Sequence, residues 1–162
     1  MVSARVRDSQ LQWPKLPLAA WSDTYQTLHL WLQIVGKVRL AASPSVNHSW
    51  HVTLYVTARG LTTSPITIDT RAFQIDFDFI EHRLAIQTSD GRVEGFALAP
   101  MSVATFYARL MKQFEKLDVG LSIHPFPNEI EHPIRFDHDE EHRAYDAEFV
   151  NRFWRALVQA DR

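Results

Sequence analysis

The stretch RAFQIDFDFIEHRLAIQTSDGRVEGFALA, residues 71–99, decides the fold of this chain. Apolar and polar residues alternate in its first part, with apolar positions at Phe73, Ile75, Phe77 and Phe79. Such alternation predicts a strand with one buried face, because successive side chains of a strand point to opposite sides of the sheet. Glu81-His82 is a candidate tight turn and Asp90-Gly91 is a strong hairpin signal, so RLAIQT and VEGFALA are predicted to be the next two strands.

The stretch WHVTLYVTARG, residues 50–60, shows the same alternation. One face carries Trp50, Val52, Leu54, Val56 and Ala58, and the other carries His51, Thr53, Tyr55, Thr57 and Arg59. We expect this strand to be followed by a break in TTSPI, where Pro65 interrupts the pattern. A further short strand is expected in LSIHPFP, residues 121–127.

Three segments have the spacing of helices that cover such a sheet. Ser22 is the expected N-cap of a helix that runs to about Ala42, and Ser102 caps a second helix that Gly120 ends. Asp146 opens the last helix. The order of elements predicts one α+β domain, with a mainly antiparallel four- to five-stranded sheet and helices packed on one face.

The two ends of the chain have different patterns. Residues 1–20 are expected to be a leader segment, and residues 146–162 a terminal amphipathic helix. The apolar stripe of this helix includes Phe149, Phe153, Trp154 and Leu157. Such a stripe needs a partner, which is the domain's own sheet, a second copy of the chain in a homodimer, or a further half of the protein.

Composition excludes several classes of function. The 162 residues include 17 Lys and Arg against 19 Asp and Glu, so there is no basic surplus of the kind that nucleic-acid binding requires. With no Cys, a disulfide framework and a Cys-based zinc site are excluded. No apolar run is long enough for a membrane span, and no signal peptide is recognisable, so we predict a cytoplasmic protein. The sequence also lacks nucleophile elbows and glycine-rich phosphate loops.

Reactive side chains are concentrated between residues 29 and 59. His29, Gln33 and Lys37 form a straight polar line on the first helix, and Arg39 lies just beyond it. One interpretation is a pocket between this helix and the first strand, and the other is simply the solvated side of a helix. The polar face of the strand has the same two interpretations, a ligand site or the wet face of a sheet.

Two patterns suggest a metal, and we predict none. His48 and His51, with Asp76 and Asp78 on the neighbouring strand, have no spacing that fixes their mutual geometry. The run HDEEH, residues 138–142, formally matches the inverted zinc-peptidase pattern. That motif needs a buried helix, whereas this run lies in an acidic, Pro-containing segment typical of a loop or a helix start.

Several long stretches resemble a known family of bacterial proteins of unknown function, DUF5996. They are HLWLQIVGKVRLA (29–41), VNHSWHVTLYVTARGLTTSPI (46–66), FDFIEHRLAIQTSDGR (77–92), FYARLM (106–111) and YDAEFVNRFWRALVQADR (145–162). The resemblance implies no established activity and no catalytic residues to carry over. It also implies that members continue past the last helix into a second half rich in Phe, Trp and His, so this chain would be a shortened form or a fragment.

Two hypotheses about function follow, and neither the cofactor nor enzymatic activity is fixed by the sequence. The first is a binding domain, or an enzyme, for a small polar or anionic molecule. The expected ligand contacts are His29, Gln33, Lys37, Arg39, Trp50, Tyr55 and Arg59, with His48 and His51 as catalytic proton-transfer groups. The alternative is a non-catalytic interaction module that uses the last helix, residues 146–162.

Overall fold

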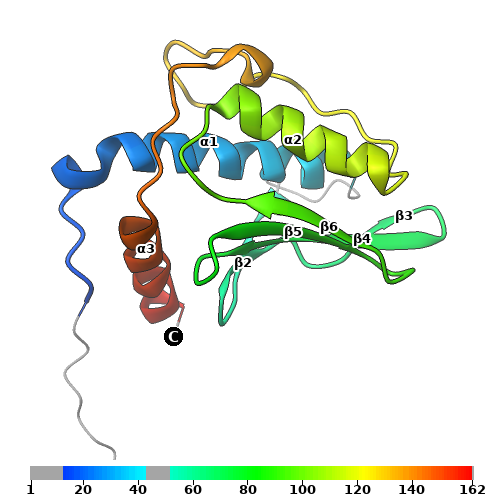
Figure 1. The fold of residues 1–162 in the computed structure, drawn as a ribbon, viewed down its shortest axis with the longest axis horizontal. Coiled ribbons are helices and arrows are strands. Elements are labelled where there is room, and N and C mark those ends of the chain that lie inside the picture. Colours follow the sequence, from blue (N-terminus) through cyan, green and yellow to red (C-terminus); the bar gives the residue numbers. More distant parts are fainter. Residues whose placement is uncertain (1–12, 43–51, 162) are drawn as a thin grey trace, which may run out of the picture.

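The structure, a computed structural model, describes residues 13–42 and 52–161 (Figure 1). These residues form an α+β fold, as the sequence predicts. In chain order the elements are α1 (Leu18–Ala42), β1 (Tyr55–Val56), β2 (Gly60–Thr62), β3 (Ile66–Ile68), β4 (Arg71–Asp78), β5 (Arg83–Thr88), β6 (Val93–Ala97), α2 (Val103–Lys116), the short 3₁₀ helix η2 (Phe136–His138) and α3 (Ala147–Ala160).

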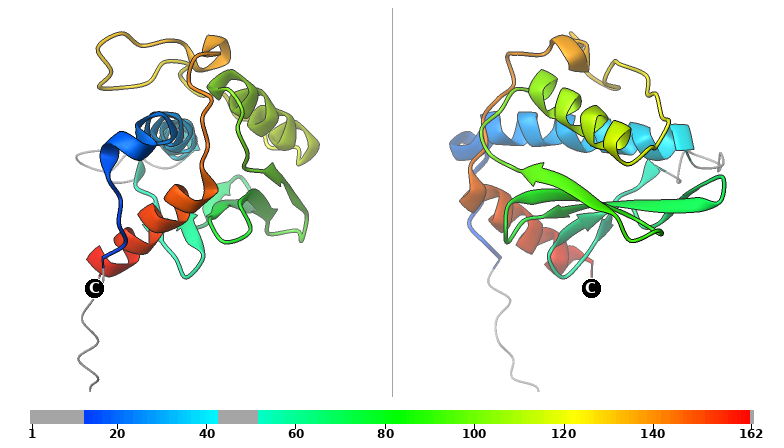
Figure 2. Two further views of the ribbon diagram at one scale, coloured as in Figure 1. Left: turned by 60° about the vertical axis from the view of Figure 1, so that its left-hand side comes forward. Right: turned by 45° about the vertical axis from the view of Figure 1, so that its right-hand side comes forward.

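The sheet is antiparallel throughout and has six strands, one more than the upper expectation. Its main order is β1-β2-β4-β5-β6, and β3 pairs with β4 beyond β2. The register places Ile75 opposite Ile86 and Phe77 opposite Leu84, so one face of β4 and β5 is continuously apolar. Figures 1 and 2 show α1 and α2 side by side over that face, which confirms the predicted fold class.

The extra strand arises because the partner of β4 is broken in two. The break lies at Thr63–Pro65, where the sequence predicts an interruption. Thr63 spans it: its backbone N–H donates to the Ile75 carbonyl, and its Oγ1 accepts from the Ile75 N–H. The side chain thus replaces a carbonyl in the ladder, so β2 and β3 stay in one sheet.

The core lies between the two helices and the sheet. Phe73, Ile75, Phe77 and Phe79 are all buried, as their alternation predicts. Trp31 of α1 stacks on Phe106 of α2 at a ring-centroid distance of 4.8 Å. Such aromatic contacts bury large apolar area and fix the two helices against each other.

The ends of the helices confirm several local predictions. Ser102 caps α2, with its Oγ accepting from the Thr105 N–H, and Asp146 caps α3. The first helix ends at Ala42 as predicted but begins at Leu18, with a kink at Trp21 just before the expected N-cap. The predicted end of the second helix at Gly120 is wrong, because α2 ends at Lys116.

Two strand predictions need correction. No strand forms over residues 121–127, where prolines remove backbone donors and Pro125 instead accepts the Phe136 N–H. The predicted strand over residues 50–60 is reduced, among its described residues 52–60, to Tyr55–Val56 and to Gly60, which begins β2. The hydroxyl of Thr57 accepts the N–H groups of Arg59 and Gly60, and this turn takes Arg59 out of the strand.

The last helix packs against its own domain. The Trp154 side chain is only 9% exposed and donates its indole N–H to the Thr57 carbonyl at 3.0 Å. Asn151 donates to the Phe79 carbonyl at 3.0 Å, and Phe153 lies against Trp21. Part of the apolar stripe is thus covered by the sheet edge and by the start of α1.

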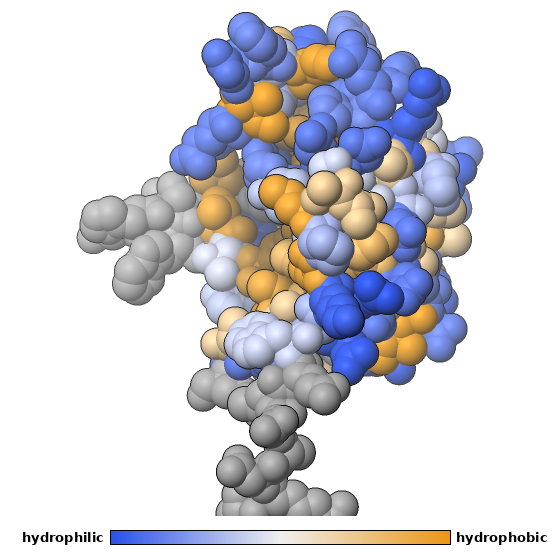
Figure 3. Space-filling model, turned by 90° about the vertical axis from the view of Figure 1, so that its left-hand side faces the viewer, coloured by the Kyte–Doolittle hydropathy of each residue, from blue (hydrophilic) through white to orange (hydrophobic). Residues whose placement is uncertain are grey.

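The side of the molecule that carries α3 and the start of α1 still displays apolar residues between charged ones (Figure 3). Trp13 and Leu18 are among the exposed large apolar side chains of the described residues. Phe149, Phe153 and Leu157 are half-buried. Over the described ranges, no helix combines the length and apolar character needed to cross a bilayer.

Candidate functional site

A cavity of about 430 Å³ lies between α1 and the chain from Val52 to Leu61. Its apolar wall consists of Leu32, Gly36, Leu40, Val52, Leu54 and Leu61. Its polar groups are His29, Gln33, Lys37, Asn128 and Glu129. A mostly apolar hollow of this size with a few polar groups is typical of a small-molecule site. The structure therefore brings the predicted line His29, Gln33 and Lys37 to one cavity.

Part of this polar line holds the irregular segment after α2 against α1. Gln33 makes two hydrogen bonds to the backbone of Asn128: its Nε2 donates to the carbonyl at 3.0 Å, and its Oε1 accepts the N–H at 2.8 Å. The Gln33 Nε2 also lies 3.2 Å from the His29 Nε2. We call the contacts of Gln33 and Lys37 with Asn128 the Asn128 latch. The latch gives Gln33 a structural role that neither interpretation of the helix line included.

Lys37 is the buried charged group among the described residues that line this cavity. Its side chain is buried, with the residue only 7% exposed, and its Nζ donates to the Asn128 Oδ1 at 3.1 Å. Among residues 13–42 and 52–161, no carboxylate forms an ion pair with it. Burial lowers the pKa of Lys37, because an ammonium group is poorly solvated there. A buried cation without a counter-charge is costly to a fold and marks a candidate site.

The predicted ligand contacts Arg39 and Tyr55 are not among the described residues that line this cavity. Arg39 is buried and lies over the ring of Tyr55, with 5.4 Å between its guanidinium carbon and the ring centroid. Tyr55 itself is largely exposed. His48, Trp50 and His51 lie outside the described residues.

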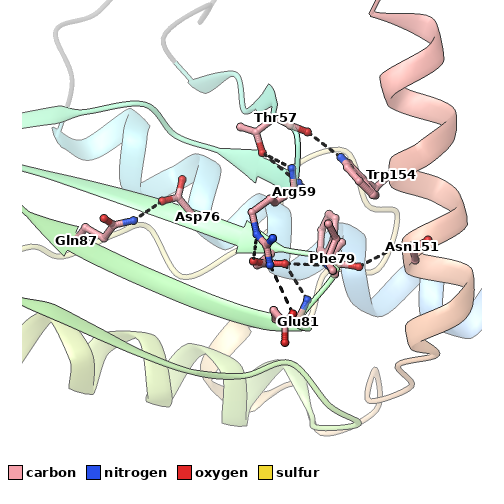
Figure 4. Close-up of polar contacts among 11 residues, drawn as sticks. Thr57, Arg59, Asp76, Phe79, Glu81, Gln87, Asn151 and Trp154 are labelled. Atoms are coloured by element: carbon pink, nitrogen blue, oxygen red, sulfur yellow. Dashed lines mark hydrogen bonds and ion pairs between the residues drawn. The ribbon is translucent and has the colours of Figure 1, made fainter.

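Arg59 lies on the opposite face of the sheet, next to α3 (Figure 4). Its Nε is 2.6 Å from the Asp78 Oδ2, and its guanidinium is 3.7 Å from the Glu81 carboxylate. It borders a surface groove of about 460 Å³ that Asp76, Asp78, Arg83 and Gln87 also line. We call this the outer groove. The structure thus separates Arg59 from Lys37, although sequence distance suggested one site.

The two aspartates of β4 are engaged within the sheet. Asp76 accepts hydrogen bonds from the Nε2 groups of Gln74 and Gln87, each at 2.9 Å (Figure 4 shows the Gln87 contact). Asp78 accepts the N–H groups of Ile80 and Glu81 as well as Arg59. Burial alone would raise the pKa of Asp78, but the hydrogen bonds from Glu81, Arg59 and Ile80 outweigh it and hold this pKa below its ordinary value.

The run HDEEH forms a turn, not a buried catalytic helix. Asp139 is 1% exposed and accepts the N–H groups of Glu141 and His142. Its Oδ2 lies 2.8 Å from the His142 Nδ1. His138 lies in η2. The described part of the chain holds no group of three or more His, Asp and Glu placed to bind a metal ion.

Sequence reasoning missed Asn128 and Glu129 and the apolar wall of the cavity. Asn128 is 95 positions from Gln33 and lies in a segment without regular structure, so no periodic signal connects the two. Gly36 did give a signal, since a glycine inside a helix suggests that something packs closely there. The structure places it in the cavity wall, where an added Cβ would meet the Val52 carbonyl at 3.7 Å.

Comparison with known proteins identifies the family and nothing finer. The model of DUF5996, a family of unknown function, matches residues 13–162. The chain belongs to this family. No curated protein and no solved structure matches it.

Proposed function

We propose that this domain binds a small molecule with an apolar body and one anionic group in the cavity beside α1. The observation that carries the proposal is Lys37, buried in the cavity wall without a carboxylate partner among the described residues. A bound anion would supply the missing counter-charge, and the interaction is strong where water is excluded.

The composition of the wall limits the kind of ligand. Six of the residues that line the cavity are apolar or glycine, and they favour an aliphatic or aromatic body. Lys37 is the one basic side chain apart from His29, and Glu129 adds a negative charge. A monocarboxylate matches this balance better than a phosphate ester, which usually engages several cations or a helix N-terminus.

A matched pair of probes tests the proposal. Phenylpropanoate carries the required apolar body and carboxylate, and its primary amide has the same shape without the charge. We expect the acid to bind the wild-type domain in isothermal titration and the amide to bind at least about tenfold more weakly, because a hydrogen bond to a charged group contributes about 1.5–3 kcal/mol. Equal binding of acid and amide would contradict the role of Lys37.

Two variants locate the site. Lys37→Met keeps most of the side-chain volume and removes the charge, and we expect it to abolish the preference for the acid. Lys112→Met is the matched control, because Lys112 is exposed on α2 away from the cavity. Unchanged binding by the Lys37 variant would refute the assignment, and a loss shared by both variants would show that only overall charge matters.

The alternative, an interaction module built on α3, has less support. Val150 and Trp154 of its stripe are buried, and Asn151 and Trp154 both bond to the sheet backbone. The half-buried Phe149 and Phe153 are the part of the stripe left for a partner. Sedimentation analysis of Phe153→Ser tests this alternative: a dimer of the wild type that this variant dissociates would favour it.

A further inference from the structure

We propose that Lys37 is a nucleophile that forms an imine with the carbonyl group of a small oxo acid held in the same cavity. This inference rests on the proposed function and narrows its ligand class from monocarboxylates to those that carry an aldehyde or ketone near the carboxylate.

The first support is the environment of the amine. A lysine attacks a carbonyl only as the neutral amine, and burial without a carboxylate favours the neutral form. Lys37 meets both conditions among the described residues, and its pKa is lowered accordingly. The uncharged amide of Asn128 holds the Nζ at 3.1 Å without stabilising the ammonium as a carboxylate would.

The second support is the contrast with the other lysines. The chain has four, and Lys15, Lys112 and Lys116 are exposed. Lys116 also pairs with the Glu94 carboxylate at 3.1 Å, which favours its charged form. Lys37 is therefore the one lysine that combines burial, a neutral partner and an adjoining cavity.

The third support is the chemistry of the product. The neutral amine adds to the carbonyl carbon, and one amine proton moves to the oxygen of the carbinolamine. A second proton, taken from solvent, lets this oxygen leave as water, and the nitrogen keeps its other proton as an iminium ion. No oxidant or reductant is consumed. The iminium formed at Lys37 carries one positive charge, which lies beside the carboxylate of the bound oxo acid. The apolar side chains of Leu32, Leu54 and Leu61 line the cavity and would contact the body of the oxo acid.

Reductive trapping tests the inference directly. The wild-type domain is incubated with phenylpyruvate and sodium cyanoborohydride near neutral pH, and the modified lysines are identified by peptide mass mapping. We expect the adduct at Lys37 to exceed that at Lys112 by about tenfold or more, because the neutral fraction of the amine is larger. Excess phenylpropanoate should suppress labelling at Lys37 and leave Lys112 unchanged.

Lys37→Arg separates the covalent step from simple binding. Arginine keeps a positive charge but does not form this imine, so the variant should give no adduct at position 37, and its affinity for phenylpropanoate reports the contribution of charge alone. Circular dichroism checks that the variant is folded, and the lysine ranking in the wild type does not depend on any variant.

The outcomes distinguish the two proposals. Labelling that follows exposure, with Lys15 and Lys112 ahead of Lys37, overturns the imine. If phenylpropanoate still binds in a Lys37-dependent way, the binding function stands without it. If neither phenylpropanoate nor phenylpyruvate engages Lys37, both proposals fail.

Discussion

The cavity beside α1 and the outer groove lie on opposite sides of the same strands, and their charged side chains have different kinds of partner. In the outer groove Arg59 pairs with Asp78 and Glu81, and Asp76 accepts from two glutamine amides. In the cavity Lys37 has one neutral amide as its partner. Both regions are open to the surface. The charges of Arg59, Asp78 and Glu81 compensate one another in the groove, whereas Lys37 has no carboxylate partner among the described residues.

The difference teaches that the number of reactive side chains is a poor guide to a site. The groove has more charged residues, but their contacts have a structural role. Asp78 at the end of β4 binds Arg59 of the preceding turn and the backbone of Ile80 and Glu81 in the following turn. Exposed pairs of this kind contribute little energy each. Lys37 is buried with a neutral amide as its partner, so it is a stronger indication of a ligand than the paired charges of the groove.

The largest effect is expected on ligand affinity, when Lys37 is given a carboxylate partner like the one that Arg59 has in the outer groove. Gln33→Glu places a carboxylate four residues before Lys37 on the same helix face, where the two side chains are neighbours. We expect affinity for phenylpropanoate to fall about ten- to hundredfold, because the new carboxylate repels the anion and pairs with the lysine. Gln26→Glu on the exposed face of α1 adds the same charge elsewhere, and calorimetry should find its affinity unchanged. Equal losses in both would show a general charge effect.

The second-largest effect is expected on stability, when the carboxylate that pairs with Arg59 in the outer groove is removed. Asp78→Ala deletes the acceptor for two backbone N–H groups and for Arg59, and we expect the free energy of unfolding to fall by about 1–2 kcal/mol in urea titration. Glu81→Ala, which loses only an exposed contact at 3.7 Å, should cost about 0.5 kcal/mol or less. Binding in the cavity should stay the same in both variants, and a change there would mean that the two regions are coupled.

The two regions should affect stability in different pH ranges: the outer groove at acid pH through Asp78, and the cavity at alkaline pH through Lys37. The pKa of Asp78 is depressed in the fold, so its contribution is present above its ordinary value of 3.8 and is lost as pH falls through the lower, folded pKa. The pKa of Lys37 is also depressed, so between that value and 10.5 the unfolded chain binds more protons and stability rises with pH. Denaturation of Asp78→Asn and Lys37→Met over the full pH range should flatten the acid and alkaline limbs respectively. A flattened limb at the wrong end would contradict the assignment.

The smallest effects, on stability and on ligand affinity, are expected from a substitution in the wall of the cavity. Gly36→Ala adds a Cβ at an ordinary contact distance of 3.7 Å from the Val52 carbonyl, and alanine is favoured over glycine in a helix by about 0.5–1 kcal/mol. We expect a slightly more stable domain with a smaller cavity and weaker binding of phenylpropanoate. Thermal unfolding and titration of the same sample measure both. A gain in stability with unchanged binding would place the ligand elsewhere.

Much of the fold was predictable because its signals are local. Ser102 and Asp146 cap their helices, and Gly91 adopts the positive φ that the hairpin signal of Asp90-Gly91 requires. Strand alternation also predicted the buried face of β4. These features depend on residues a few positions apart, where side-chain chemistry and spacing are sufficient.

The site was only half predictable because it depends on distant contacts. The line His29, Gln33 and Lys37 was recognised by helical spacing, but the Asn128 latch joins segments with no periodic relation. Arg59 was misplaced because the Thr57 hydroxyl turns the chain, and alternation alone does not report a side-chain hydrogen bond to the backbone. The strand predicted over residues 121–127 is absent for a similar reason: its prolines lack N–H donors, and the Pro125 carbonyl accepts the N–H of Phe136.

The break at Thr63–Pro65 also affects how the protein behaves at high concentration. A long, flat edge strand offers unpaired N–H and carbonyl groups on which another chain can add, which leads to aggregation. Here the strands on that side of β4, namely β2 and β3, are three residues each, and β1 at the end of the main order is two. Pro65, which has no N–H to offer, separates β2 from β3. The interruption at Thr63–Pro65 therefore shortens the template on which intermolecular strands would grow.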